Sequence, residues 1–234
     1  FINSQGKSFA EGLRNQRPVT DKAIAIWQQQ IREIDRSILP AAATASLDGM
    51  QSRLTSLANL RNEAEGLKIS AQQAAEFYTA TIDQLLGLIE AVGGMASDGR
   101  VIRQAQALAA ISRQKEFAGQ ERAMGAAGFG AGEFNPAVHR NFLELGAQQK
   151  AQAAAFQANA TKSEIDTVNR ALSGSFIDDL KRMRAIAAAA PFEGGAVRSV
   201  SGAQWFDVAT QYIDALKAVE DQVATNVVAV VQAV

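Results

Sequence analysis

The amino-acid sequence predicts an all-α protein made of two tandem up-down four-helix bundles that share long helices. Three observations lead to this fold class. Apolar residues recur at steps of three and four along most of the 234 residues, and no stretch shows the two-residue alternation typical of a strand. Helix-capping signals stand in front of several of these runs. Short patterns also recur in the same order in both halves of the chain, which indicates a duplicated helical unit.

We expect residues 1–16 to form a loop or a short helical turn. Pro18 is then predicted to lie in the first turn of a helix, because a proline there loses no intrahelical hydrogen bond. Apolar residues continue at helical spacing as far as Ile38, and Pro40 ends the run. A second helix is predicted to end near Gly66.

The next capping box, Ser70 with Gln73, predicts a helix that Gly93 and Gly94 close or bend. Asp98 then restarts the chain as a long helix with a glycine-rich exit. The later capping signals are Asn135-Pro136, Thr161 with Glu164, and Ser201 with Gln204. We expect the second of these signals to open one helix ending at Pro191, followed by a loop over residues 192–202.

The internal repeat sets the predicted domain organisation. Thr79, Ile82-Asp83 and Leu85 match Thr210, Ile213-Asp214 and Leu216, whereas Leu57 and Arg61 match Leu180 and Arg184 at a smaller offset. We therefore divide the chain into a first bundle unit, residues 1–97, and a second unit, residues 98–234. The helix that would open the first unit has no counterpart in the chain, so we expect that unit to be incomplete at its N-terminus.

Composition excludes several classes of function. The net charge of −1 gives no footprint for nucleic acid or for anionic lipid. The absence of cysteine excludes disulfides and sulfur-ligated metals. No apolar run reaches the roughly 18 residues that a membrane span needs. Because the chain starts at Phe1, we expect it to be part of a longer protein.

Arg122 is the first candidate functional residue. Heptad steps backwards from Arg122 pass Ala118 and Ile111, so this arginine falls on a mostly apolar helix face. A guanidinium in that position keeps its charge and needs an anionic partner. Two interpretations remain open: an internal salt bridge with Glu116, Glu121 or a carboxylate on another helix, and a site for a small anion.

Arg184 and Arg61 are the second candidates, because they occupy matched places in the repeat. Each of them follows an inward-facing leucine by four residues, which places it at or beside the helix seam. Solvated helix arginines are common, so a surface role stays open for both. The glycines of residues 119–132 favour close helix approach, with backbone N–H groups exposed to an anion as the alternative.

The polar residues offer no catalytic constellation. His139 is the sole histidine, and the carboxylate-x-x-His pair of di-iron bundles does not occur. Gln149 and Gln152 either line a polar pocket or lie on the bundle surface, and the surface is the favoured interpretation. We therefore expect neither an enzyme nor a cofactor or metal.

Three segments carry a resemblance to a known family: KEFAGQERAMGAAGFGAGEF, Leu180-x-x-Met183-Arg184, and WFDVATQYIDALKAVE at residues 205–220. Together they resemble the nitrate- and nitrite-sensing (NIT) domain of bacterial chemoreceptors, sensor kinases and some transcription antiterminators. The resemblance covers nearly the whole chain. It implies two helical bundles that bind nitrate or nitrite through arginines on different helices.

The resemblance also implies which residues bind the anion. By motif, Arg122 and Arg184 are the expected ligands, with Arg182 as the neighbouring alternative to Arg184 and Arg61 as the repeat equivalent. The family's first Glu-Arg motif, which contributes ligand arginines, has no counterpart in this chain.

The implied function is that of a ligand-sensing domain of a bacterial signalling receptor, a chemoreceptor or sensor kinase, which passes a helix shift to an output module. The expected setting is a homodimer at the bacterial inner membrane, with a span outside this chain and this domain in the periplasm or, alternatively, the cytoplasm. The alternative function is a structural or protein-interaction module whose arginines are paired internally and which binds no small ligand. A small carboxylate or another oxyanion also stays open as the ligand.

Overall fold

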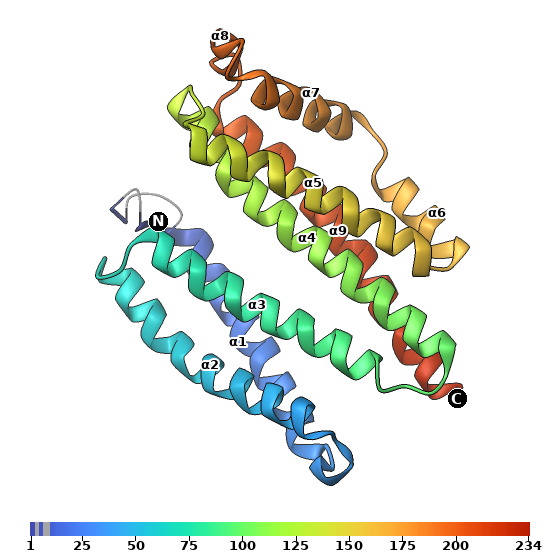
Figure 1. Ribbon diagram of the computed structural model, residues 1–234. Helices are drawn as coiled ribbons and strands as arrows, with labels where there is room; N and C mark the ends of the chain where they lie inside the picture. The colour runs from blue at the N-terminus through green and yellow to red at the C-terminus, as the bar shows by residue number, and fades with distance from the viewer. Residues whose placement is uncertain (3–4, 7–9) are drawn as a thin grey trace. The chain divides into compact units, whose positions relative to one another are not determined.

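The computed structural model describes residues 1–2, 5–6 and 10–234, and Figure 1 shows that they form helices joined by short connections. No strand occurs among the described residues, which confirms the all-α prediction. The chain divides into two compact units, Phe1–Val92 and Gly93–Val234. The division into bundle units between residues 97 and 98 stays a prediction.

The first unit contains three α-helices and a short 3-10 helix among the described residues: α1 Ala10–Glu33, η2 Arg36–Ile38, α2 Ala41–Glu65 and α3 Ala71–Gly93. Gly66 ends α2, as predicted. The predicted capping box in front of α3 is confirmed. The backbone N–H of Gln73 donates to Ser70 Oγ at 3.1 Å, and the backbone N–H of Ser70 donates to Gln73 Oε1 at 2.8 Å.

Helix α1 begins earlier than predicted. It starts at Ala10, so the expected loop over residues 1–16 is wrong for residues 10–16, and its residues 3–4 and 7–9 lie outside the described part of the chain. Pro18 consequently lies inside the helix. Inside a helix a proline has no amide for the hydrogen bond and its ring crowds the carbonyl four residues earlier, so we expect Pro18 to weaken or kink α1 at this point.

Helix α1 also ends earlier than predicted, at Glu33 instead of at Pro40. The carboxylate of Asp35 accepts hydrogen bonds from the backbone amide and the hydroxyl of Ser37, at 2.9 and 2.7 Å. Such local side-chain bonds compete with the helical pattern. They turn the chain into η2, although the apolar spacing continues through Ile38.

The second unit holds six helices: α4 Gly99–Ala131, α5 Pro136–Asn159, α6 Lys162–Ala171, α7 Ser175–Ala189, α8 Gly194–Val197 and α9 Gly202–Gln232. α4 packs along both α5 and α9, and α6 and α7 lie against α9 (Figure 1). This unit is therefore an up-down bundle in which α6 and α7 together occupy one helix position. The predicted caps of α4, α5, α6 and α9 are confirmed.

The single helix predicted from Thr161 to Pro191 is wrong, because the chain breaks between α6 and α7. Gly174 adopts a φ of +111°, which L-residues rarely reach, and the Ser173 hydroxyl donates to the carbonyl of Arg170 at 2.6 Å. The predicted loop over residues 192–202 likewise contains the one-turn helix α8.

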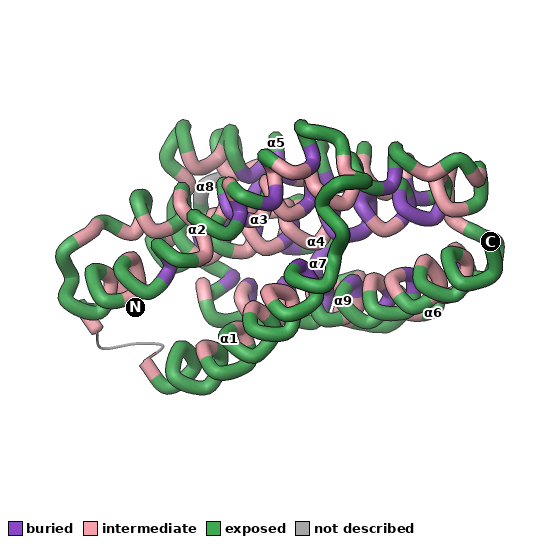
Figure 2. Tube along the Cα trace, turned by 90° about the horizontal axis from the view of Figure 1, so that it is seen from below, coloured by how far each residue is buried: buried purple, intermediate pink, exposed green. Residues whose placement is uncertain are grey.

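The core of the second unit gathers around Trp205, whose side chain is fully buried. Its ring centroid lies 5.6 Å from that of Phe129 and 5.3 Å from that of Phe142. The indole N–H donates to the backbone carbonyl of Arg122 at 2.9 Å. Figure 2 shows the buried positions, and along α4 they recur over the length of the helix.

Close packing of aromatic rings explains two of the glycines in α4. A Cβ atom on Gly125 would lie 2.3 Å from the indole of Trp205, and one on Gly128 would lie 2.4 Å from the ring of Phe134. The first contact joins α4 to α9 and confirms close helix approach at Gly125, whereas Phe134 lies in the connection that follows α4. Gly132 has a φ of +72° and forms the left-handed C-cap of α4.

The glycine contacts give a testable prediction. We expect Gly125→Ala to lower the free energy of unfolding by roughly 1–3 kcal/mol, because an added methyl group overpacks the Trp205 contact. Gly119→Ala is the matched control, since a Cβ atom added there would have no neighbour within 4 Å. That variant should gain about 0.5–1 kcal/mol from helix propensity. Urea unfolding measures both, and equal effects would contradict the packing explanation.

Candidate functional site

Arg122 lies on α4 and its side chain reaches α9. Its Nη1 donates to Thr210 Oγ1 at 2.8 Å, and its guanidinium carbon lies 4.5 Å from the ring centroid of Phe206, a cation–π contact. The hydrogen bond from Trp205 to the Arg122 carbonyl holds the backbone at this point. Among the described residues, no carboxylate lies within ion-pair distance of Arg122.

The charge of Arg122 is incompletely compensated. Burial lowers the pKa of Arg122, and the attraction of Asp214 offsets that effect only in part. The guanidinium nevertheless stays protonated, because an arginine pKa is too high for deprotonation at neutral pH. A half-buried cation with four further N–H donors is well suited to a small anion.

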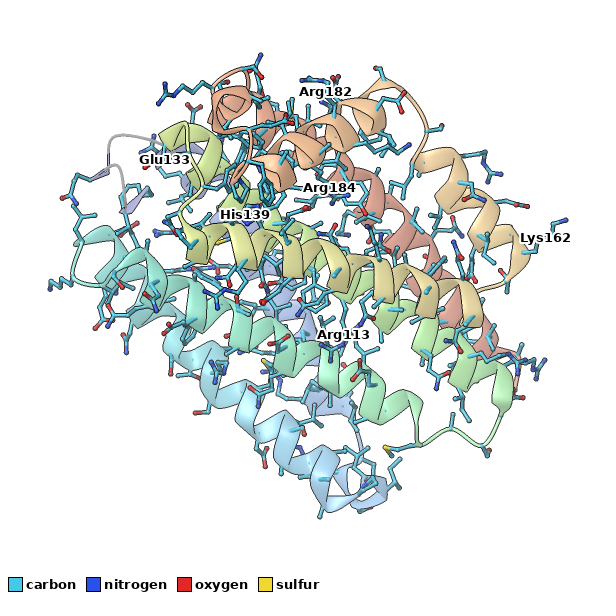
Figure 3. The ribbon with its side chains drawn as sticks, turned by 45° about the horizontal axis from the view of Figure 1, so that its top comes forward. Arg113, Glu133, His139, Lys162, Arg182 and Arg184 are labelled. Carbon is cyan, nitrogen blue, oxygen red and sulfur yellow. The ribbon has the colours of Figure 1, made fainter. Side chains whose placement is uncertain are left out.

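Arg184, on α7, is in contrast fully engaged by a carboxylate. Its Nε and Nη2 donate to Glu121 Oε1 and Oε2 at 2.9 and 2.5 Å, in the parallel two-bond geometry that arginine and carboxylate favour. Glu121 is 2% exposed. Figure 3 labels Arg184 on the side of α7 that faces the bundle. Glu121, one of the internal partners left open for Arg122, thus pairs with Arg184.

Gln149 completes this buried network, so its predicted surface position is wrong. Its Nε2 donates to Glu121 Oε2 at 2.9 Å, and its Oε1 accepts from Arg184 Nη2 at 2.8 Å. Arg184 also lies over the ring of Tyr212, at 5.2 Å from the centroid. Burial lowers the pKa of Arg184, but the charge and hydrogen bonds of Glu121, with a smaller effect of Tyr212, raise it above the ordinary value.

The two arginines contact different sides of α9. Arg122 contacts Phe206 and Thr210, which are four residues apart on one face, whereas Arg184 contacts Tyr212. Two residues of separation correspond to about 200° around a helix. Within the described part of the chain, no hydrogen bond or ring contact is shared by both guanidiniums, so the structure does not gather them into one cluster.

Arg61 and Arg182 both pair with carboxylates. Arg61, in the first unit, donates to Asp21 at 2.5 Å and lines a cavity of about 380 Å³. Burial lowers the pKa of Arg61, but Asp21 and then Tyr78 raise it above the ordinary value. Arg182 donates to Asp179 at 3.0 Å on the outer side of α7 (Figure 3).

Sequence reasoning missed the residues that hold Arg122. Thr210 is one of the residues matched in the internal repeat, and Phe206 lies in the segment of residues 205–220 that resembles the family. Neither was expected to contact Arg122. The sequence signal that could have found them is their spacing of four residues, which places both side chains on one face of the helix. The described residues contain no group of histidine and carboxylate side chains that could hold a metal ion.

Comparison with known proteins identifies the family. Residues 1–228 match the family described as "Nitrate and nitrite sensing", and the chain belongs to it. It is 27% identical, over 169 residues, to the nitrate regulatory protein of Klebsiella oxytoca, covering 72% of this chain and 41% of the relative. Its fold resembles the structure of the NasR transcription antiterminator, with a TM-score of 0.88 and 22% identity, over all of this chain and 62% of that one.

The chain therefore spans about two fifths of the curated relative and about three fifths of the solved structure. The output functions of those longer proteins do not transfer from these matches. None of the described helices has the length and apolarity needed to cross a membrane.

The buried network gives a second prediction. We expect Arg184→Ala to lower the free energy of unfolding by roughly 3 kcal/mol, because it leaves the Glu121 carboxylate buried without its cation. This is the lower end of the usual range, since the Arg184 side chain is 28% exposed. Arg182→Ala, two residues away on the same helix, should stay within about 0.5 kcal/mol of the wild type. Urea unfolding at neutral pH compares them. A loss in Arg184→Ala as small as that in Arg182→Ala would contradict the cost of leaving Glu121 unpaired.

Proposed function

We propose that this chain senses nitrate or nitrite by binding the anion at Arg122. Two observations support the proposal. The chain belongs to the nitrate- and nitrite-sensing family. Among the four candidate arginines, Arg122 alone lacks a carboxylate partner in the described part of the chain, and this second observation carries the choice of residue.

The chemistry of the guanidinium fits a planar oxyanion. Arginine can donate two parallel hydrogen bonds to two oxygens of nitrate or nitrite, which a lysine ammonium cannot reproduce. Thr210 uses Nη1, and the stacking contact with Phe206 fixes the plane of the fork. The same geometry accepts a small carboxylate, so the distinction between anions depends on binding measurements.

Arg184 has a different role in this proposal. Taking Arg184 away from Glu121 would leave a buried carboxylate unpaired, at about 3–5 kcal/mol. Binding with a millimolar dissociation constant releases only about 4 kcal/mol. We therefore propose that Arg184 stays paired and keeps Glu121 from neutralising Arg122, its neighbour in the chain. Arg61 and Arg182 are also paired, with Asp21 and Asp179, but both of these carboxylates are exposed, so release from them would cost only about 0–1 kcal/mol.

Signal transfer would follow from the contact between α4 and α9. Arg122 belongs to α4, whereas Thr210 and Phe206 belong to α9. An anion that favours one relative position of these helices shifts the population toward it, by no more than its differential affinity for the two positions. α9 extends 22 residues beyond Thr210 to Gln232 and would carry the shift onward.

In this proposal, the output module is of the kind that the names of the relatives indicate. The curated relative is named a nitrate regulatory protein and the solved structure a transcription antiterminator. We favour a regulator of that kind over a chemoreceptor or sensor kinase with its membrane span outside this chain. The domain itself would be non-catalytic, would act as a homodimer and would leave any nucleic-acid contact to other parts of the protein, given its net charge of −1.

One group of contacts favours the alternative, a structural or protein-interaction module without a small ligand. The pairs Arg184–Glu121 and Arg61–Asp21 are internal, as that function requires. Arg122 does not fit it, because a half-buried guanidinium without a carboxylate partner contributes less to stability than a hydrophobic residue would.

Titration with nitrate, nitrite and chloride tests the proposed function. Binding to the folded state should raise the melting temperature with nitrate or nitrite but not with chloride. Stabilisation reaches about 2.7 kcal/mol at a hundredfold excess over the dissociation constant. Arg122→Ala should abolish the response while far-UV circular dichroism shows unchanged helicity.

Arg122→Lys serves as the control for charge alone. It keeps the cation but loses the planar fork, so we expect affinity to fall at least about tenfold. A nitrate response that survives in Arg122→Ala would remove Arg122 from the site. A wild type that responds to none of the anions would favour the structural module.

A further inference from the structure

A second cavity lies at the other end of α4 and has no part in the proposed nitrate site. Its volume is about 560 Å³, and it is lined by the early residues of α4, the connection between α5 and α6, and the last turns of α9. In Figure 3 the labelled Lys162 marks the start of α6 at this end of the bundle. From Gln104 to Arg122, α4 rises by about 27 Å.

The inner wall of this cavity is negatively polarised. Glu164 is 2% exposed, and its carboxylate accepts hydrogen bonds from Gln104 at 3.0 Å, Asn226 at 2.7 Å and the Thr161 amide at 2.7 Å. Burial raises the pKa of Glu164, but these hydrogen bonds together outweigh it and lower the pKa below its ordinary value. The carboxylate therefore stays ionised at neutral pH.

Gln104 supplies an unsatisfied acceptor beside that carboxylate. The side chain is 4% exposed and lines the cavity, and its Nε2 is used by Glu164. Its Oε1 is buried and accepts no hydrogen bond from the described residues. A buried acceptor without a donor is unfavourable, so a ligand that supplies an N–H group gains affinity here.

The outer wall is positively charged. Arg100 and Arg103 line it, and both are exposed. Arg100 is paired with Asp98 at 2.8 Å, whereas no ion pair of Arg103 is found in the described part of the chain. Between these walls the lining is small and apolar, with Ala160 and Ala229 among its residues.

This distribution of charge selects one class of ligand. A simple anion would be repelled by Glu164, and a simple cation would be repelled by Arg103, because the charge of Arg100 is compensated by Asp98. We propose that the cavity binds a free amino acid, with its ammonium group on Gln104 Oε1 and Glu164 and its carboxylate on Arg103. The cavity volume falls in the range of small-molecule sites, and the alanines leave room for an aliphatic side chain.

Isothermal titration calorimetry of the protein with L-leucine, L-glutamine and glycine tests this proposal. Leucinamide, which lacks the carboxylate, and isovalerate, which lacks the ammonium group, serve as controls. We expect saturable binding of at least one amino acid, and at least tenfold weaker binding of both leucine analogues. Binding of none of the amino acids, or equal binding of an analogue, would overturn the proposal and leave water as the occupant.

Two variants locate the binding. Gln104→Met keeps the length of the side chain but removes the acceptor, and Arg103→Gln removes the cation at the outer wall. Each should weaken amino-acid binding at least tenfold while circular dichroism shows a folded protein. Arg140→Gln, an exposed arginine outside the cavity, is the matched control and should bind as the wild type does. Unchanged binding in both cavity variants would place the amino acid elsewhere and contradict the assignment.

Discussion

The buried ion pair between Glu121 and Arg184 is the interaction on which the candidate site depends. Glu121 precedes Arg122 in the chain and is the carboxylate nearest to it in sequence, yet both of its oxygens are taken by Arg184 and Gln149. Removing one partner of such a pair is far more costly than leaving a half-buried arginine to find another anion. Pairing across α4, α5 and α7 therefore leaves Glu121 no free role as a partner of Arg122, whose charge the attraction of Asp214 offsets only in part.

Packing between α4 and α9 positions Arg122 and its incompletely compensated charge. Gly125 lets the indole of Trp205 approach the α4 backbone, and the indole N–H then bonds the carbonyl of Arg122. Further along, Ser112 donates to Glu220 at 2.6 Å, so the same two helices are joined again by a polar contact. A small relative movement of α4 and α9 would change the surroundings of Arg122 directly, which is the property a sensor needs.

The sequence predicted the fold more fully than the site, for physical reasons. Capping boxes such as Thr161 with Glu164 are local, and their hydrogen bonds need only a few neighbouring residues. The break at Gly174 and the turn at Asp35 were missed because apolar spacing continues across both. The partner of Glu121 lies 63 residues away on α7, and spacing along one helix cannot show which of two arginines it selects. The buried position of Gln149 follows from that same long-range network.

A crystal structure of the protein grown with nitrate tests most directly whether Arg122 binds the anion. The account predicts a planar anion at about 2.7–3.1 Å from the guanidinium of Arg122, with the pair between Glu121 and Arg184 intact. It also predicts that Thr210 and Phe206 keep their contacts with Arg122. A nitrate ion bound elsewhere, or one held by Arg184 after its release from Glu121, would contradict the account.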